Sequence, residues 1–211
     1  MSVVRFAPVE GEYDERWLTA AERSRRDRLV QTPDRTAFVA AHVLVRECAA
    51  ALLDAEPRDV VIAHRCRDCG GEDHGAPYVV GADLHVSLSH TRGWVAAVAA
   101  ATPCGIDVQE VGHVPDLALS EAELAWAGED AVRRTLLWSR KEALAKAGLA
   151  DVGAFWEHDV RARDARIRDW ADDGVVGAWV IAGPDDTGDP DDTGDTGDTE
   201  DAAGPVLGGT P

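Results

Sequence analysis

The sequence predicts an α+β fold, because helical and strand patterns follow one another without a repeated β-α-β unit. Long apolar stripes with a helical period occupy residues 32–56 and the segment that ends near Gly148. Shorter strand patterns occupy residues 84–90, 94–101 and 105–111. With 211 residues, the chain is long enough for one domain or two small ones with a sizeable core.

Capping signals mark where the predicted helices begin. Thr19 and Glu22 have the spacing of a capping box, and so do Ser120 and Glu123, which start a short helix. The long apolar helix between them is expected to begin with Thr32 as its cap and a proline at its first helical position. Helices are therefore predicted on both sides of the central strands.

The predicted strands differ in how much of their surface is buried. Apolar and polar residues alternate in 84–90, which is typical of a half-buried strand, whereas 94–101 is apolar throughout and predicts a fully buried one. Short strands and a Gly-rich loop are expected in 57–83, and closing strands in 152–163 and 175–183.

A weak internal duplication predicts two similar lobes. Each half contributes a long apolar helix and strands that end in an Ala/Val-rich run, WVAAVAA in one half and VVGAWVIA in the other. We place the N-terminal lobe at 1–105 and the C-terminal lobe at 106–183. A functional site is expected at the junction of the two lobes, where pockets commonly form.

Charge is distributed unevenly along the chain. Residues 184–211 carry nine acids, no base and a repeated DTGD unit, so they hold half of the formal net charge of −18. This acidic tail has no apolar periodicity, and we expect it to be disordered. The remaining negative charge argues against a nucleic-acid binder, although the run at 22–28 is basic.

The sequence also gives expectations for the cellular compartment. No apolar run approaches the length needed to span a bilayer, and the first fifteen residues are acidic where a signal peptide would be basic and then apolar. We therefore expect a cytoplasmic protein without a membrane partner.

Four cysteines do not indicate a disulfide scaffold in a chain of this size. Cys66 and Cys69 form a Cys-x-x-Cys pair with His64 and His74 nearby, which is half of a structural zinc site. No second pair of this kind exists in the sequence. The favoured interpretation is a loop turn that carries two thiols, and metal binding stays open.

Residues 138–149 place Glu142 and Lys146 four residues apart in an otherwise apolar helix. Such a pair is ordinarily a surface ion pair that stabilises a helix by about 0.2–0.5 kcal/mol. Alternatively, the carboxylate holds a metal ion and the lysine holds a phosphate. The helix alone does not decide between these interpretations.

The strand at 105–111 carries a second candidate feature. Its two-residue period places Asp107 and Gln109 on one face, and their oxygens suit a hard divalent cation. Aspartate is disfavoured inside strands, so its position between apolar neighbours needs a reason. The alternative is an aspartate of an edge strand that faces water.

Polar groups gather in the segment 88–93, between two predicted strands. Ser89, His90, Thr91 and Arg92 offer hydroxyls, an imidazole and a guanidinium, which together with loop amides can bind a phosphate group. A polar hairpin turn without a ligand is the alternative.

Taken together and in this order, three motifs resemble those of the 4′-phosphopantetheinyl transferase superfamily, in particular its Sfp-like single-chain branch. The motifs are Leu88-Ser89-His90, Gly105-Ile106-Asp107 and Trp138-Ser139-Arg140-Lys141-Glu142 through Lys146. The resemblance covers roughly residues 15–183 and implies a pseudo-duplicated two-lobed fold. It also implies a monomeric, Mg²⁺-dependent enzyme that uses coenzyme A as its substrate.

The resemblance implies a role for each matched residue. Asp107 and Glu142 would bind Mg²⁺, with Gln109 as the third contact. Lys146 would contact the pyrophosphate of coenzyme A and stabilise the leaving 3′,5′-ADP. Ser89 and His90 would hold the 3′-phosphoadenosine end, and either Glu142 or Glu123 would help to deprotonate the acceptor serine. Glu123 is also a capping-box residue, so both roles stay open for it.

The chain departs from the family pattern at three places. Many relatives have an acid where this chain has Gln109, which weakens the third metal contact. The Gly-Lys-Pro element reads Gly75-Ala76-Pro77 and so lacks a lysine that can touch the nucleotide. An arginine that often precedes the aromatic residue of the long helix is Ala37 here. Arg35 lies nearby, off register, and is our candidate for coenzyme A binding.

The expected function is transfer of the 4′-phosphopantetheine arm of coenzyme A to a serine of an acyl or peptidyl carrier protein. The single-chain branch often serves polyketide and nonribosomal peptide synthesis, so secondary metabolism is favoured. Two alternatives stay open. One is an Mg²⁺-dependent phosphohydrolase of nucleotides or coenzyme A, and the other is a catalytically silent module that binds carrier proteins or zinc.

Overall fold

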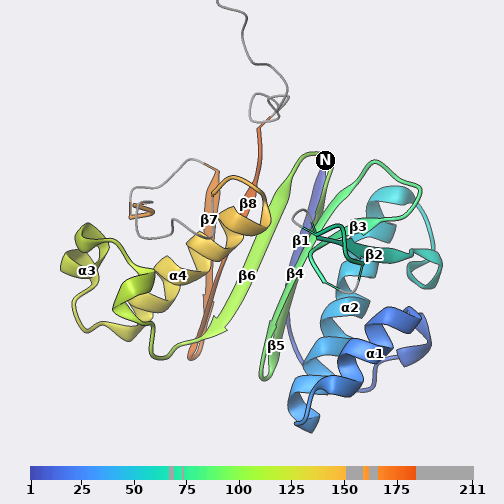
Figure 1. The fold of residues 1–211 in the computed structure, drawn as a ribbon, viewed down its shortest axis with the longest axis horizontal. Helices are drawn as coiled ribbons and strands as arrows, with labels where there is room; N and C mark the ends of the chain where they lie inside the picture. Colours follow the sequence, from blue (N-terminus) through green and yellow to red (C-terminus); the bar gives the residue numbers. More distant parts are fainter. Residues whose placement is uncertain (67–68, 73, 151–158, 162–165, 184–211) are drawn as a thin grey trace, which may run out of the picture.

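The computed structural model describes residues 1–66, 69–72, 74–150, 159–161 and 166–183. These residues form a mixed α+β fold, as predicted, and their strands build two antiparallel sheets (Figure 1). The acidic tail expected at 184–211 lies outside the described residues. So does most of the closing strand expected at 152–163.

The larger sheet has five strands in the order β1-β5-β4-β3-β2, and each strand is antiparallel to its neighbours. Its strands are β1 (Ser2–Pro8), β2 (Ile62–Arg65), β3 (Ala76–Val79), β4 (His85–Thr91) and β5 (Trp94–Ala100). The smaller sheet has the order β6-β8-β7 and is also antiparallel. Its strands are β6 (Cys104–Glu110), β7 (Ile167–Asp172) and β8 (Val175–Ile181). The chain therefore leaves the first sheet between β5 and β6, close to the expected lobe boundary.

The helices are α1 (Ala20–Arg28), α2 (Thr32–Leu53), α3 (Glu121–Ala127) and α4 (Ala131–Lys146), with short 3-10 turns η1 (Glu15–Trp17), η2 (Pro57–Asp59) and η3 (Asp116–Ala118). Both predicted capping boxes are present, at the starts of α1 and α3. The predicted cap of α2 is wrong. Thr32 is already helical, and Gln31 precedes it without a side-chain capping bond. The proline in the first turn sets the backbone angle there, so the helix starts without a polar cap.

The two sheets pack face to face between two long helices (Figure 1). The helix α2 covers the outer face of the five-stranded sheet, and α4 covers the outer face of the three-stranded sheet. Between the sheets, Val98 of β5 packs with Ile106 and Val108 of β6, and these three side chains are fully buried. This shared core holds β4 and β6 in fixed positions relative to each other.

The strand β4 is buried on both faces, so the prediction of a half-buried strand is wrong. Val86 faces the core under α2, as expected. Ser87 and Ser89 point the other way, but the second sheet covers them. The hydroxyl of Ser87 accepts a hydrogen bond from the backbone N–H of Ile106, which satisfies the buried oxygen. The polar positions of this strand, Ser87 and Ser89, therefore lie in the interface between the two sheets and do not face water.

The helix α2 contradicts the expectation that no apolar run approaches the length needed to span a bilayer. It is 22 residues long and contains a window with a hydropathy of 1.6, so by length and composition it could cross a membrane. Within that window 72% of the residues are buried inside the structure. The apolar surface of α2 is thus largely used in packing against β4 and β5.

A buried ion pair fastens α1 to α2. Arg46 donates from Nη2 to Oε2 of Glu22 at 2.7 Å, and both side chains are almost fully buried. Burial alone would raise the pKa of Glu22, but the hydrogen bond and charge of Arg46 outweigh it and lower the pKa. The pair fixes the helix that carries the basic run of 22–28.

We expect Arg46→Met to lower the free energy of unfolding by about 3–5 kcal/mol, because it leaves the Glu22 carboxylate buried without its cation. The matched control is Arg5→Met, since Arg5 forms an exposed pair with Glu47 whose loss should cost about 1 kcal/mol or less. Urea denaturation of both variants measures the difference. Equal losses in the two variants would contradict this role for the buried pair.

Candidate active site

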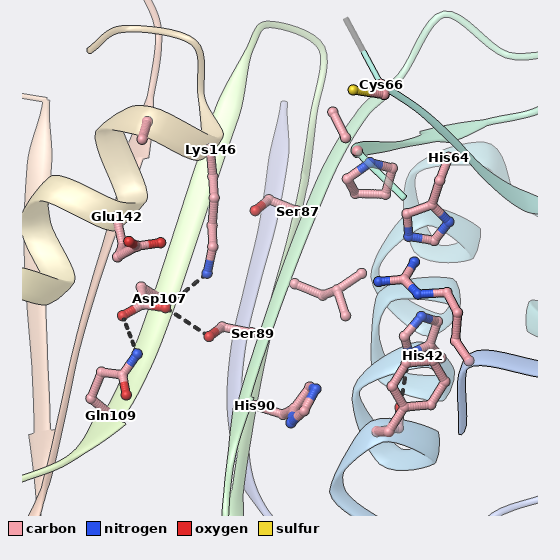
Figure 2. A pocket seen from close by; sticks show the side chains of 17 residues that line it. His42, His64, Cys66, Ser87, Ser89, His90, Asp107, Gln109, Glu142 and Lys146 are labelled. Atoms are coloured by element: carbon pink, nitrogen blue, oxygen red, sulfur yellow. Dashed lines mark hydrogen bonds and ion pairs between the residues drawn. The ribbon is translucent and has the colours of Figure 1, made fainter. Parts of the chain in front are cut away.

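A cavity of about 600 Å³ lies where the two sheets and their helices meet (Figure 2). One wall comes from α2, β4 and the β2–β3 region, and the other comes from β6 and the last turns of α4. Its lining residues are Arg25, Phe38, His42, His64, Cys66, Gly75, Ala76, Pro77, Ser87, Leu88, Ser89, His90, Asp107, Gln109, Glu142, Ala145 and Lys146. Both parts of the chain that the sequence assigns to separate lobes contribute to it.

Close contact between β6 and α4 positions one end of this cavity. A Cβ atom on Gly105 would lie 1.9 Å from the carbonyl oxygen of Ala143, so a larger residue would push the helix away from the strand. The absence of a side chain lets the backbone of α4 rest on β6. As a result, Glu142 and Lys146 on the last turns of α4 lie beside Asp107 of β6 (Figure 2).

Asp107 is the centre of a hydrogen-bond network. Its Oδ1 accepts from the ammonium of Lys146 at 2.7 Å and from the hydroxyl of Ser89 at 2.8 Å. Its Oδ2 accepts from the amide nitrogen of Gln109 at 3.1 Å, which confirms that these two side chains share a strand face. Asp107 is only 1% exposed. The alternative of an edge-strand aspartate that faces water is therefore wrong.

Glu142 and Lys146 do not form the ordinary helix pair. The ammonium of Lys146 contacts Asp107 on β6 and also donates to the carbonyl oxygen of Ile106 at 3.1 Å. The carboxylate of Glu142 points into the cavity, as Figure 2 shows. Burial raises the pKa of Glu142, the nearby charge of Asp107 raises it further, and Lys146 partly offsets both. Two carboxylates and one ammonium thus share this end of the cavity.

The other end of the cavity is aromatic and basic. The rings of Phe38 and His42 stack with centroids 3.9 Å apart, and His90 meets Phe38 edge-on at 6.0 Å. The guanidinium of Arg25 lies 5.9 Å from the centroid of the Phe38 ring. Burial, followed by the charge of Lys146, lowers the pKa of His90. Flat rings and a cation next to hydroxyls suit a planar base that carries phosphate groups.

Glu123 lies away from the cavity. It is fully buried, and Lys141 holds its Oε2 at 2.7 Å. The backbone N–H groups of Ser120 and Val160 donate to its two oxygens at 2.8 and 2.9 Å. The structure does not bring this carboxylate together with Asp107 and Glu142, and its contacts are those of a helix cap and a core ion pair.

The predicted basic residues Arg35 and Arg92 also lie outside the cavity lining. Arg35 donates from Nε to the carbonyl oxygen of Leu29 at 2.6 Å and lines a separate hollow near the start of α2. Arg92, in the turn between β4 and β5, bonds to Asp34 and Gln31 at 3.1 and 2.8 Å. From the segment 88–93, Leu88, Ser89 and His90 line the cavity.

Several cavity residues carry no sequence signal that points to this site. Arg25 belongs to the basic run at 22–28, and it replaces Arg35 as the arginine near the aromatic pair. Phe38 and His42 lie one helical turn apart on α2, and His64 is on β2. A histidine in an apolar helix was the available signal for His42, but its partners come from elements that are distant in the sequence.

Two buried histidines make a testable contribution to stability. Burial lowers the pKa of His42 to about 4 and that of His64 to about 4, the latter with help from the charge of Arg25. In the unfolded chain both would titrate near 6.5. Between these values the unfolded state binds more protons than the folded state, so stability falls as the pH falls, by up to about 1.4 kcal/mol per pH unit for each histidine.

Between pH 6.5 and pH 4, we therefore expect the free energy of unfolding to fall less steeply with pH in His42→Gln than in the wild type. The difference in slope should be up to about 1.4 kcal/mol per pH unit, the contribution of one histidine. Urea denaturation at half-unit pH steps measures this slope. The control is His113→Gln, which removes an exposed imidazole outside the core and should keep the wild-type slope. A His42→Gln slope equal to that of the wild type would show that His42 protonates without unfolding.

The chain matches no protein-family model and no curated protein. Of the predicted site residues, the structure brings Ser89, His90, Asp107, Gln109, Glu142 and Lys146 together at this cavity.

Proposed function

We propose that this chain is a 4′-phosphopantetheinyl transferase, a holo-[acyl-carrier-protein] synthase that modifies a serine of an acyl or peptidyl carrier protein. One observation supports this most. Two carboxylates, Asp107 and Glu142, and the ammonium of Lys146 meet at one end of a cavity whose other end is aromatic and basic. This arrangement suits a substrate with a pyrophosphate at one end and a nucleotide at the other. The expected setting is polyketide or nonribosomal peptide synthesis.

The donor set at the carboxylate end fits Mg²⁺. Asp107 and Glu142 offer hard oxygen ligands. Burial, together with the charge of Asp107, raises the pKa of Glu142, so a cation beside these carboxylates would stabilise their charged forms. The two carboxylates would hold the ion, which would offset charge on the pyrophosphate oxygens. Gln109 turns its amide nitrogen toward Asp107, so its role in this arrangement is to orient that carboxylate. If the side-chain amide of Gln109 flips, its oxygen rather than its nitrogen would face the metal ion.

In the proposed reaction the serine oxygen bonds to the phosphorus that carries the pantetheine arm. The bond from this phosphorus to the bridging oxygen breaks, and 3′,5′-ADP leaves. Lys146 contacts the developing charge on the leaving group, which is a large source of rate enhancement in such displacements. Of the two carboxylates that the motifs propose as base, Glu142 is the one at the cavity. We therefore assign acceptance of the serine proton to Glu142 rather than to Glu123.

At the nucleotide end, we assign Ser89 and His90 to the phosphoadenosine group. The hydroxyl of Ser89 already donates to Asp107, so this serine connects the two ends of the cavity. Arg25 supplies a cation there in place of Arg35, which lies in a separate hollow. Phe38 and His42 offer a stacked aromatic surface to a base.

The plan of the two halves agrees with a duplicated fold. In each half one long helix, α2 or α4, covers the outer face of an antiparallel sheet. The inner faces of both sheets meet, and the cavity opens along this meeting line. We propose that the two halves are related lobes and that coenzyme A binds at their junction in a monomer.

The test is incubation of the protein with coenzyme A and Mg²⁺, with and without an apo carrier protein. Transfer predicts 3′,5′-ADP in amounts that match the modified carrier, and no 3′,5′-ADP when the carrier is omitted. Release of 3′,5′-ADP without a carrier would instead indicate the phosphohydrolase. Binding of the carrier without any product would indicate a silent carrier-binding module.

The role of Gln109 gives a separate prediction. Gln109→Glu adds a negative charge beside Asp107 and should tighten Mg²⁺ binding in the absence of coenzyme A. Gln109→Ala should lose less activity than Asp107→Ala, because water can take the place of the amide. Calorimetry and Mg²⁺ titration of transfer measure these effects. An unchanged Mg²⁺ dependence in Gln109→Glu, with an active Asp107→Ala, would remove β6 from the metal site.

A further inference from the structure

A second cluster of metal-binding side chains lies in the loop between β2 and β3. The donor atoms of Cys66, Cys69 and His74 all lie within 4.8 Å of one another. Sγ of Cys69 and Nε2 of His74 are 3.3 Å apart. None of these residues has a part in the proposed transfer chemistry, although Cys66 reaches the cavity wall.

Backbone hydrogen bonds among the described residues of this loop form a turn, and the two thiol sulfurs lie within 4.8 Å of each other. The N–H of Gly70 donates to the carbonyl oxygen of Cys66 at 3.0 Å, and the N–H of Cys66 donates to the carbonyl oxygen of Gly71 at 2.8 Å. Gly70 has a φ of 70°, which a residue with a side chain rarely adopts. The N–H of Gly71 donates to Sγ of Cys69 at 3.4 Å and so helps to hold this sulfur in place.

We propose that Cys66, Cys69 and His74 bind one Zn²⁺ ion. Two thiolates and an imidazole are ligands that zinc prefers. Tetrahedral bonds of about 2.3 Å to sulfur and 2.0 Å to nitrogen place the donor atoms about 3.5–3.8 Å apart, within the spread observed here. Binding releases the two thiol protons to solvent. Cys69 and His74 are exposed, so water completes the fourth position.

The proposed ion would tie the end of β2 to the start of β3. Gly75, Ala76 and Pro77 follow His74 directly and line the large cavity. A Cβ on Gly75 would lie 2.3 Å from the carbonyl oxygen of Arg65. The backbone at Gly75, just before β3, therefore packs directly against the end of β2. Zinc would therefore hold the cavity wall that these residues form. This role is structural and is separate from the Mg²⁺ proposed at Asp107 and Glu142.

The other two cysteines do not compete for a metal. Cys48 and Cys104 are buried in apolar surroundings, and burial raises the pKa of each thiol to about 12. Both therefore stay protonated at neutral pH. A thiolate–metal signal from this protein reports on Cys66 and Cys69.

The experiment is a Co²⁺ titration of the full-length, metal-stripped and reduced protein, followed by displacement with Zn²⁺. We expect one equivalent of Co²⁺ with a thiolate charge-transfer band in the near ultraviolet and the visible bands of a tetrahedral site. Zn²⁺ should remove both sets of bands and raise the melting temperature. Absence of the thiolate band, or a disulfide between Cys66 and Cys69 in the protein isolated under reducing conditions, would overturn the proposal.

Variants identify the ligands. Cys69→Ser and His74→Ala should each weaken Zn²⁺ binding by more than about 100-fold, because a lost ligand costs more than a lost supporting contact. Cys104→Ala and His113→Ala should bind Zn²⁺ as the wild type does. Circular dichroism of each metal-free variant checks that the fold is kept. Wild-type affinity in both ligand variants would overturn the proposal.

Neither readout uses phosphopantetheine transfer. A protein that binds zinc but transfers nothing would retain this inference and lose the proposed function. A protein that transfers but gives no cobalt–thiolate band would lose the inference and retain the function.

Discussion

Glu142→Gln is expected to abolish phosphopantetheine transfer and, at the same time, to stabilise the metal-free protein at neutral pH. Burial, together with the charge of Asp107, raises the pKa of Glu142 in the folded state. A raised carboxyl pKa means that folding is favoured at low pH and that this stability is lost as the pH rises through the folded-state pKa. Glutamine keeps the shape of the side chain without this loss, but it supplies neither a metal-binding carboxylate nor a base.

Two measurements check this prediction. The melting temperature in a chelator should be higher for Glu142→Gln than for the wild type at pH 7, and the difference should shrink as the pH falls toward 4. Transfer by the variant should be at background. Glu110→Gln, which removes an exposed carboxylate of β6, is the matched control and should change neither quantity substantially. Near-normal turnover in Glu142→Gln would show that the site is misplaced.

Asp107→Asn is expected to reduce kcat/KM for transfer by at least about 10²–10³-fold, the loss that follows removal of one electrostatic contact from a preorganised site. Asparagine has nearly the same size and can still accept from Ser89, but it removes the charge that holds Lys146 at 2.7 Å. The stability change should be modest, because the Lys146 side chain is 30% exposed and water can solvate its ammonium.

The measurement for Asp107→Asn is a matrix of coenzyme A and Mg²⁺ concentrations in the transfer assay. A loss that saturating Mg²⁺ does not restore places the charge of Asp107 in the reaction itself. Again Glu110→Gln is the control, since it removes a carboxylate from the same strand. If Asp107→Asn transfers at the wild-type rate, the network around Asp107 is structural, and the proposed chemistry would have to be abandoned.

The sequence predicted the carboxylate end of the site well, because local periodicity determines it. The two-residue period of β6 places Asp107 and Gln109 on one face, and the hydrogen bond between them confirms it. The four-residue spacing of Glu142 and Lys146 likewise places both on one side of α4. Local spacing does not say that Lys146 pairs with Asp107, since this contact joins a strand to a helix 39 residues away.

The other end of the cavity was poorly predicted, because residues that are far apart in the sequence build it. Arg25, His42 and His64 come from α1, α2 and β2, and each looks ordinary within its own segment. Nearness to the expected motif position favours Arg35, but the structure places this arginine in another hollow near the start of α2. The burial of Ser87 and Ser89 was missed for a related reason. A period of two marks two faces of a strand without revealing that a second sheet covers the polar one.

The capping-box spacing predicts where a helix starts, but it does not determine the function of the residues in the box. The Ser120–Glu123 spacing correctly predicted the start of α3, but it left open whether Glu123 also acts as a base. Its contact with Lys141 inside the core could not be read from this spacing. The three-dimensional contacts therefore carry the assignment of Glu142, rather than Glu123, as the carboxylate of the proposed reaction.

Mass spectrometry of an apo carrier protein most directly tests the proposed transfer. A candidate acyl or peptidyl carrier protein is incubated with coenzyme A, Mg²⁺ and the wild-type chain, and in parallel with Glu142→Gln. The proposed function predicts that the wild type adds one phosphopantetheine arm to the carrier serine and that the variant adds none. An unmodified carrier with the wild type, across several acyl and peptidyl carriers and with the protein shown to be folded, would contradict it.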